Sequence, residues 1–277
     1  MRAIKIVRFV FLFLTIAVVF SYLVSCRSKS TQNSNSENIN EAIRQEIEAY
    51  AYPLPSPFET TQMLNEIEAF YLSGISNDPG NASNYFTEKS KALNLGIYSA
   101  DLAYATTYQK KQEMQEYFGA SETLIRELDF AGAFDKDLAE RIENSFENKD
   151  QLVEVITEIF QNAYSYLNRE GRSELSYLVL AGTIVEGLYL TTHISENTFQ
   201  NPKIIAAILF QKEPLQNLQK MMEDYNEGDL IQETYRDIKQ INDIYAQEPG
   251  YTSMTEDQLK KLTGLLAMIR NRYINRQ

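Results

Sequence analysis

The chain has 277 residues, of which 44% are hydrophobic and 23% charged, so it contains enough apolar material for a sizeable core in one or two domains. Its formal net charge is −12, and no basic cluster with interleaved aromatic residues offsets this charge. Because so acidic a chain repels phosphate backbones, the composition argues against nucleic acid as a partner.

The first 26 residues combine a short basic segment with a long uncharged one. Three basic residues within the first eight precede an uncharged run from Phe9 to Ser25, which is the pattern of a secretory signal. The run ends in Leu23-Val24-Ser25-Cys26, which resembles the lipobox of bacterial lipoproteins. That resemblance implies that residues 1–25 are a signal peptide and that Cys26 becomes the lipidated N-terminus of the mature chain.

Cys26 is the only cysteine, so it has no disulfide partner within the chain. The alternative to lipidation is an uncleaved anchor with an incidental cysteine, although the uncharged run is only just long enough for a bilayer core of about 30 Å. Acyl chains on Cys26 would hold the protein at a membrane durably. Because Arg27 rather than an aspartate follows the cysteine, the expected location is the outer membrane in the cell envelope of a Gram-negative bacterium.

The segment between Cys26 and the first long helix is irregular. Residues 27–38 (RSKSTQNSNSEN) are polar and aperiodic, which predicts a flexible tether. Isoleucines at four-residue spacing predict a short amphipathic helix from Ile39 to about Tyr50. Three prolines within Tyr52–Pro57 favour an extended segment, Met63–Tyr71 has the apolar spacing of a helix, and Gly74–Asn84 reads as a loop.

From Thr87 onward, apolar residues recur at helical spacing, and caps and breakers divide them into segments. No segment shows sustained period-two alternation, so the predicted fold is all-α. We expect residues 39–277 to form a single compact, bundle-like domain of about ten helices around one buried central helix. The predicted helices from Thr87 cover 87–108, 110–130 with a weak point at Gly119, 135–148, 152–171, 174–193, 202–226 split near Pro214, 229–247, and 255–273 with a capping box at its start.

The central element of this predicted fold is Ser173–His193, which is apolar almost all round and is therefore expected to be buried on all sides. Gly171 and Ser173 fit the end of the preceding helix and the N-cap of this one. Gly182 and Gly187 each cost roughly 1 kcal/mol of helix propensity against alanine. That cost is understandable if other helices approach the backbone closely at both glycines.

Three stretches together carry a family resemblance. They are Tyr52–Glu59 (YPLPSPFE), Thr87–Tyr104 (TEKSKALNLGIYSADLAY) and Gly171–Leu190 (GRSELSYLVLAGTIVEGLYL). They resemble an uncharacterised family of helical lipoproteins or periplasmic proteins of Bacteroidetes-type bacteria. The resemblance implies a cell-envelope location and a helical fold, and it implies no catalytic residue.

Glu186 lies in the middle of the most apolar helix, so it must be paired, hydrogen-bonded or protonated. Perturbed carboxylates of this kind occur at functional sites and also in structural networks. His193 is the only histidine and follows Glu186 by two helical turns, and Glu196 follows three residues later. This spacing fits a helical metal site formed by Glu186, His193 and Glu196. The alternative is that His193 caps or packs near a helix end, and with so few ligands we predict no cofactor.

Asp101 is enclosed by small and apolar residues. Asn94, Asp101 and Tyr108 recur at heptad spacing and form a polar stripe that also includes Lys91. This stripe either lines a cleft or faces solvent. Tyr98 and Tyr189 are suited to the wall of a ligand pocket, although tyrosine equally fills cores. Asp101, Tyr98 and Tyr189, together with Glu186, are therefore the candidate ligand-binding residues, with a structural role as the alternative.

The last predicted helix is basic within an acidic chain, because it contains two lysines and two arginines and is followed by Arg276. Its late arginines, among them Arg270 and Arg272, suit the negative end of a helix dipole. A docking surface is the alternative interpretation of these basic residues.

The sequence contains none of the common catalytic motifs. No glycine-rich phosphate loop follows a strand, no nucleophile lies in a recognisable elbow, and there is no His-Glu-x-x-His. We therefore expect a membrane-tethered cell-envelope lipoprotein that acts as a non-enzymatic binding or structural module, with an unknown protein or small molecule as its partner. The alternative is a helical metal-binding protein or a metal-dependent enzyme.

Overall fold

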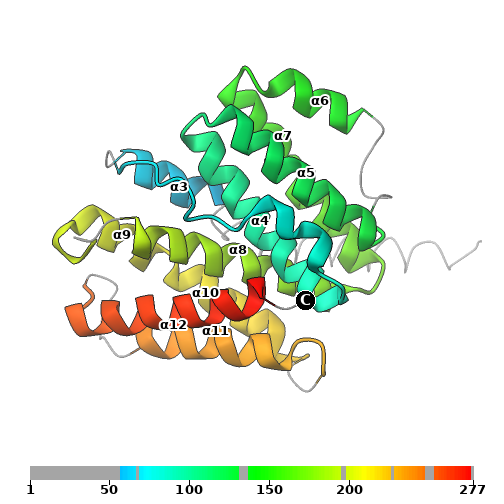
Figure 1. Ribbon diagram of the computed structural model, residues 1–277. Helices are drawn as coiled ribbons and strands as arrows, with labels where there is room; N and C mark the ends of the chain where they lie inside the picture. Colours follow the sequence, from blue (N-terminus) through cyan, green and yellow to red (C-terminus); the bar gives the residue numbers. More distant parts are fainter. Residues whose placement is uncertain are drawn as a thin grey trace, which may run out of the picture. The chain divides into compact units, whose positions relative to one another are not determined.

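Two helices, α4 (Glu88–Thr107) and α8 (Ser173–His193), pack along each other at the centre of a helical bundle (Figure 1). The described part of the chain contains ten α-helices, two short 3-10 helices and no strand, so the predicted all-α fold is confirmed. It belongs to one compact unit, residues 46–277. The computed structural model describes residues 57–66, 69–130, 137–194, 198–225, 228–246 and 253–275.

The other elements surround the central pair. They are α3 (Pro57–Glu66), η1 (Pro79–Asn84), α5 (Lys111–Glu127), α6 (Leu138–Ser145), α7 (Lys149–Arg169), η3 (Thr198–Gln200), α9 (Pro202–Phe210), α10 (Lys212–Glu223), α11 (Gln232–Tyr245) and α12 (Glu256–Ile274).

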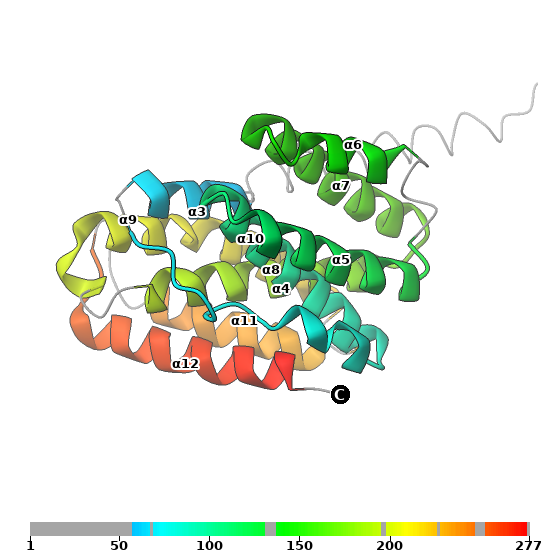
Figure 2. The same ribbon diagram turned by 45° about the horizontal axis from the view of Figure 1, so that its top comes forward.

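Helices cover α4 and α8 from several sides (Figures 1 and 2). The α5 helix packs on α4, α7 packs on both central helices, and α6 lies on α7. The α12 helix packs on α8, and α11 lies beside α12. Both central helices are buried on most sides, whereas α7, α10 and α11 are strongly amphipathic. This contrast matches the central position of α4 and α8.

The close approach of α4 and α8 depends on two glycines that face the partner backbone. A Cβ on Gly96 would lie 1.9 Å from the Val179 carbonyl oxygen, and a Cβ on Gly182 would lie 2.0 Å from the Leu93 carbonyl oxygen. Any side chain at either position would therefore push the two backbones apart. The predicted close approach is confirmed at Gly182 and is wrong at Gly187, where no atom of another described helix lies within 4 Å of a Cβ.

Several helix ends lie where caps and breakers in the sequence predicted them. Thr87 caps α4 in a capping box with Ser90, and Thr255 caps α12 in a capping box with Gln258. The predicted helix over residues 202–226 is divided into α9 and α10 at Gln211, three residues before the proline expected to split it. Side-chain hydroxyls and proline act within one helical turn, so these features are readable from neighbouring residues alone.

Other expectations for helix ends were wrong. Ser173 is the first helical residue of α8 rather than its N-cap, and Gly119 does not interrupt α5. In the predicted helix over 63–71, residues 69–71 are not helical, and α3 (Pro57–Glu66) begins six residues earlier than predicted. Beyond it, tertiary hydrogen bonds hold the chain in place: the Leu72 N–H donates to the Tyr104 hydroxyl at 2.9 Å.

By length and composition alone, α8 is the one helix in the described ranges that could cross a membrane, but 89% of its apolar window is buried inside the protein. It is therefore the buried central helix that was predicted. The predicted helix 39–50, most of the proline segment, Cys26 and Glu196 lie outside the described residues.

Candidate functional site

Glu186, in the middle of α8, is fully buried and is held by Arg270 of α12. The Nε and Nη2 groups of Arg270 donate to the two carboxylate oxygens at 2.6 and 2.8 Å. Nη2 also donates to the Ile75 carbonyl oxygen at 3.1 Å, and the guanidinium lies 4.2 Å from the centre of the Tyr189 ring. Both oxygens of Glu186 are therefore engaged by a bidentate partner, which compensates the buried charge.

Asp101, on α4, is fully buried next to this ion pair. Its Oδ2 accepts a hydrogen bond from the Asn77 N–H at 3.1 Å, whereas its Oδ1 has no hydrogen-bond partner in the described part of the chain. Burial, and then the neighbouring Glu186 carboxylate, raise the pKa of Asp101 well above its usual range, against a smaller opposite effect of Arg270. The neutral carboxyl is therefore favoured, so this group of two acids and one base has no net charge.

Hydrogen bonds extend this cluster along the polar stripe of α4. The side-chain amide of Asn77 donates to Oδ1 of Asn94 at 3.3 Å, and the side-chain amide of Asn94 donates to the backbone carbonyl of Tyr273 at 3.0 Å. The Tyr98 hydroxyl donates to the Asp78 carbonyl at 2.8 Å. Asn94 and Asp101 are buried, whereas Lys91 and Tyr108 are half-buried, so the middle of the stripe does not face solvent. We call Asn77, Asn94, Asp101, Glu186 and Arg270 the polar network.

His193, at the end of α8, is half-buried and bonded to its own helix. Its Nδ1 lies 2.9 Å from the Tyr189 carbonyl oxygen and 3.0 Å from the Thr192 hydroxyl, and its ring stacks on Tyr189 with 4.0 Å between centroids. Burial lowers the pKa of His193, against the effect of the Tyr189 carbonyl. This arrangement matches the packing alternative rather than a metal ligand.

The metal hypothesis has little support from this geometry. Within the ranges that the structure covers, no group of three or more His, Cys, Asp and Glu side chains is arranged to hold an ion. Glu196 lies outside those ranges, and both oxygens of Glu186 are bonded to Arg270. The proposed metal set of Glu186, His193 and Glu196 therefore stays a prediction.

Three of the candidate residues chosen from the sequence lie around Arg270, for which the sequence suggested another role. Asp101, Glu186 and Tyr189 all interact with Arg270, which was expected to act at the helix dipole. That expectation was wrong, because the Arg270 side chain is buried on the inner face of α12. Arg270 follows Leu266 by four residues, so helical spacing alone places it on the apolar, buried face of the helix. Whether any of these residues binds a ligand stays a prediction.

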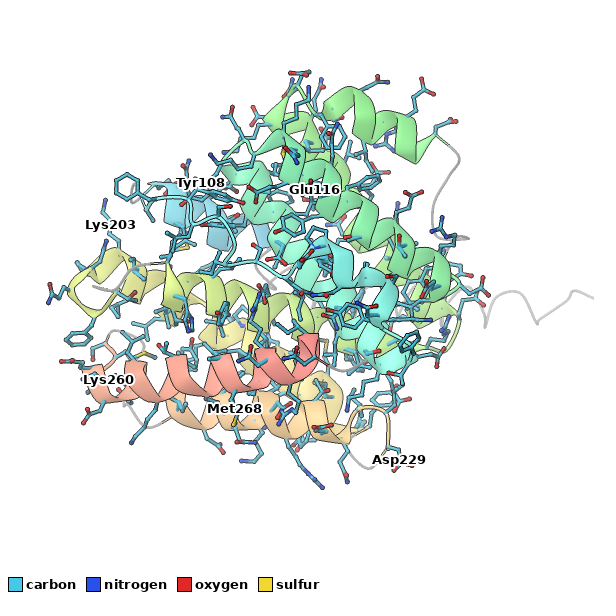
Figure 3. All side chains as sticks on the ribbon, in the orientation of Figure 1. Tyr108, Glu116, Lys203, Asp229, Lys260 and Met268 are labelled. Carbon is cyan, nitrogen blue, oxygen red and sulfur yellow. The ribbon has the colours of Figure 1, made fainter. Side chains whose placement is uncertain are left out.

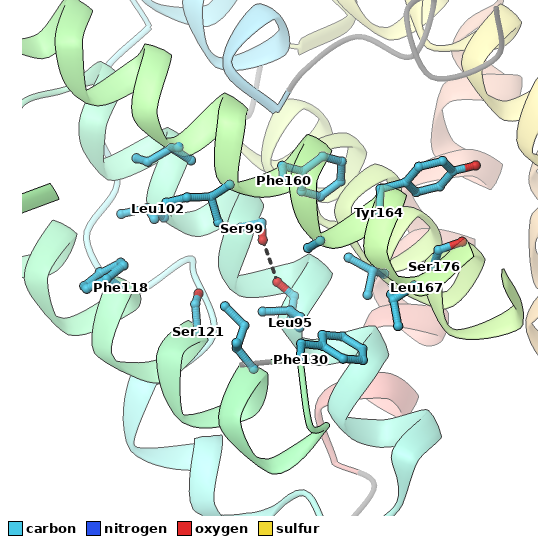
Figure 4. Close-up of a pocket in the computed structure, with 15 residues that line it drawn as sticks. Leu95, Ser99, Leu102, Phe118, Ser121, Phe130, Phe160, Tyr164, Leu167 and Ser176 are labelled. Carbon is cyan, nitrogen blue, oxygen red and sulfur yellow. Dashed lines mark hydrogen bonds between the residues drawn. The ribbon is translucent and has the colours of Figure 1, made fainter. Parts of the chain in front are cut away.

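A second region, on a neighbouring face of α4, is apolar and incompletely filled. A cavity of about 50 Å³ lies between α4, α5, α7 and α8 (Figure 4). Ser121, on α5, lines it and is buried, and its hydroxyl has no hydrogen-bond partner in the described residues. The residues lining it are mostly aliphatic or aromatic: Leu95, Ser99, Leu102, Phe118, Ser121, Ile125, Phe130, Ile156, Ile159, Phe160, Ala163, Tyr164, Leu167, Ser176 and Val179.

None of the candidate residues chosen from the sequence lines this apolar cavity. Its aliphatic and aromatic side chains have the same helical spacing as ordinary core residues, so the sequence pattern carries no separate signal for it. The polar network, by contrast, stood out because charged residues interrupt apolar helices.

Comparison with models of known protein families, with curated proteins and with solved structures gave no match. The resemblance to helical lipoproteins of Bacteroidetes-type bacteria therefore stays a prediction, as does the cell-envelope location.

Proposed function

We propose that this protein is a membrane-tethered cell-envelope lipoprotein whose helical domain binds the alkyl end of a small amphiphilic ligand without changing it chemically. The observation that carries the binding proposal is the apolar cavity between α4, α5, α7 and α8. The tether rests on the sequence, where a basic segment and an uncharged run lead to Leu23-Val24-Ser25-Cys26, outside the described residues.

The size and the walls of the cavity define the ligand class. A cavity needs only about 10–15 Å³ to hold a water, but the water also needs two to four polar partners. Of the four hydroxyl groups in these walls, those of Ser99, Tyr164 and Ser176 already hydrogen-bond within the protein, and only that of Ser121 has no partner among the described residues. About 50 Å³ is smaller than the roughly 150 Å³ of an engineered cavity that accepts benzene. The space is therefore suited to the end of an alkyl chain.

The rest of such a ligand can remain at the surface. Ile159, Phe160 and Ala163 of α7 line the cavity and are only half-buried, so the apolar space extends toward the outside of the bundle. A polar head group would then stay hydrated while the chain end replaces empty apolar space, which is favourable by about 0.8 kcal/mol for each buried methylene.

The metal-dependent alternative has less support, because its central carboxylate is bonded to Arg270 through both oxygens. A carboxylate engaged in this way has to break a buried ion pair before it can bind an ion or act on a substrate. We therefore favour binding over catalysis.

Mass spectrometry of the membrane fraction tests the tether. We expect the mature chain to begin at Cys26 and to carry acyl groups, and we expect Cys26→Ala to leave the chain unprocessed or to release it from the membrane. A Cys26→Ala chain that is processed and membrane-bound as before would contradict the lipoprotein proposal.

Photolabelling tests the binding site. Membranes containing the full chain are photolysed with a fatty acid that carries a diazirine near its chain end, and the labelled residues are mapped by mass spectrometry. We expect label on the residues that line the cavity and a clear loss of that label in Ala163→Leu, which fills the space. The control is Asn162→Leu, at an exposed neighbouring position on the same helix. Equal labelling of the cavity residues in both variants, or label only elsewhere, would contradict the proposal.

A further inference from the structure

The α9 helix is apolar almost all round, like α8, but it is covered on one side only. Ile204 and Ile208 are buried, whereas Ala206 is exposed and Phe210 is 50% exposed. Phe199, in the adjacent η3, is 41% exposed. Apolar helices of this kind are normally buried on all sides, so the outer side of α9 is a surface for which the described residues provide no cover.

This surface is hollowed. An open groove of about 680 Å³ lies between η3, α9, the start of α10 and the segment before α12, and the exposed Glu213 of α10 also lines it. Lys203 lies at the same end of the bundle, and its side chain extends outward (Figure 3). We call the surface the α9 face and define it by its exposed or half-buried residues, Phe199, Lys203, Ile205, Ala206, Leu209 and Phe210.

We propose that the α9 face lies on the lipid bilayer to which the chain is tethered, an inference that rests on the proposed lipid anchor at Cys26. The chain enters the described domain at Pro57, the first residue of α3, and α3 packs against α9 (Figures 1 and 2). The first described helix after the anchor therefore lies beside α9.

The residue types of the α9 face fit this partner. Phenylalanine and aliphatic side chains insert at the boundary between head groups and acyl chains, and a flanking lysine extends to the head groups. Phe199 and Phe210 are the exposed aromatic residues of this face, and Lys203 is its exposed cation. A weak interfacial contact suffices here, because the anchor already holds the domain at the membrane.

The absence of tryptophan from the chain allows a site-specific test. Phe210→Trp introduces a single indole on the α9 face, and Phe199→Trp is a second reporter of the same face. The matched control is Phe86→Trp, at a residue that is 71% exposed and immediately precedes the cap of α4. Each full-length lipidated variant is reconstituted into phosphatidylcholine vesicles, and circular dichroism confirms that it is folded.

Brominated acyl chains quench an indole only when it enters the bilayer. We expect vesicles of brominated phosphatidylcholine to quench most of the emission of Phe210→Trp and little of the emission of Phe86→Trp. Equal quenching of the two reporters while the chain co-sediments with vesicles would overturn the inference and leave the anchor standing. A blue shift that depends on protein concentration and not on bromination would also overturn it, since a second copy then covers the face. A chain that does not co-sediment contradicts both the anchor and this inference.

Discussion

The polar network and the apolar cavity both adjoin α4, but their buried side chains differ in kind. In the polar network, Glu186 and Arg270 form a bidentate pair, and Asn77 and Asn94 hydrogen-bond the groups around it. In the cavity region, apolar side chains leave space, and the Ser121 hydroxyl has no partner among the described residues. The comparison teaches that buried charge and empty apolar space are separate features of this protein, because both oxygens of Glu186 are bonded to Arg270 and other residues line the cavity.

The first prediction breaks the polar network. Arg270→Met leaves the Glu186 carboxylate buried without its partner, so we expect a loss of about 3–5 kcal/mol in the free energy of unfolding. Urea denaturation measures it, and Lys261→Met, at an exposed position on the same helix, is the control. Adding Glu186→Leu to Arg270→Met should restore much of the loss. An unchanged midpoint in Arg270→Met would mean that the pair does not hold the network together.

The second prediction tests the close packing of α4 and α8, the two central helices. Gly182→Ala places a Cβ against the Leu93 carbonyl, so we expect destabilisation at or above the upper end of about 1–3 kcal/mol. Gly187→Ala, five residues later in open space, should instead stabilise the protein by up to about 1 kcal/mol through helix propensity. Opposite shifts of the thermal midpoint are the expected result, and shifts of the same sign would contradict the close approach.

The third prediction uses pH to test the neutral state of Asp101 in the polar network. A carboxyl with a raised pKa in the folded state contributes stability that is fully present below its unfolded pKa and is lost as the pH rises through the folded pKa. While Asp101 is protonated only in the folded protein, the slope for that one proton is about 1.4 kcal/mol per pH unit.

Asp101→Asn removes this proton while keeping the shape of the neutral acid. We therefore expect the stability of the variant relative to wild type to rise with pH above the ordinary aspartate range, and the two proteins to converge at acid pH. The groups that interact with Asp101, namely Glu186, Arg270, Tyr85, Tyr98, Tyr104 and Tyr117, are unchanged by the substitution. Parallel pH profiles of unfolding would show that Asp101 does not keep its proton.

The fourth prediction concerns the cavity region and is the smallest. An unpartnered buried hydroxyl is unfavourable by about 1–3 kcal/mol, part of which is regained when it is removed, so Ser121→Ala should stabilise the protein by about 1 kcal/mol. Thr123→Val, two residues later, removes a hydroxyl that donates to the Gly119 carbonyl, and it should not stabilise the protein. Destabilisation by Ser121→Ala would indicate that the hydroxyl has a partner in solution.

Much of the architecture follows from short-range features of the sequence. The apolar circumference of Ser173–His193 predicted a buried central helix, and the Thr87 and Thr255 caps marked two helix starts, because these signals act within a few residues of the chain. Glu186 and Asp101 could also be singled out from their neighbours in the sequence. Each is a carboxylate in an apolar helix, and burying a carboxylate is unfavourable whatever the helix packs against.

Tertiary structure decided what these residues meet. The sequence marked Gly182 and Gly187 alike, but only Gly182 faces another backbone, because the crossing point of α4 and α8 depends on both helices. Arg270 reaches Glu186 across 84 positions of sequence, and no local pattern encodes that distance. The cavity is likewise a difference between the volume enclosed by four helices and the volume of their side chains, so it exists only once α4, α5, α7 and α8 have packed together.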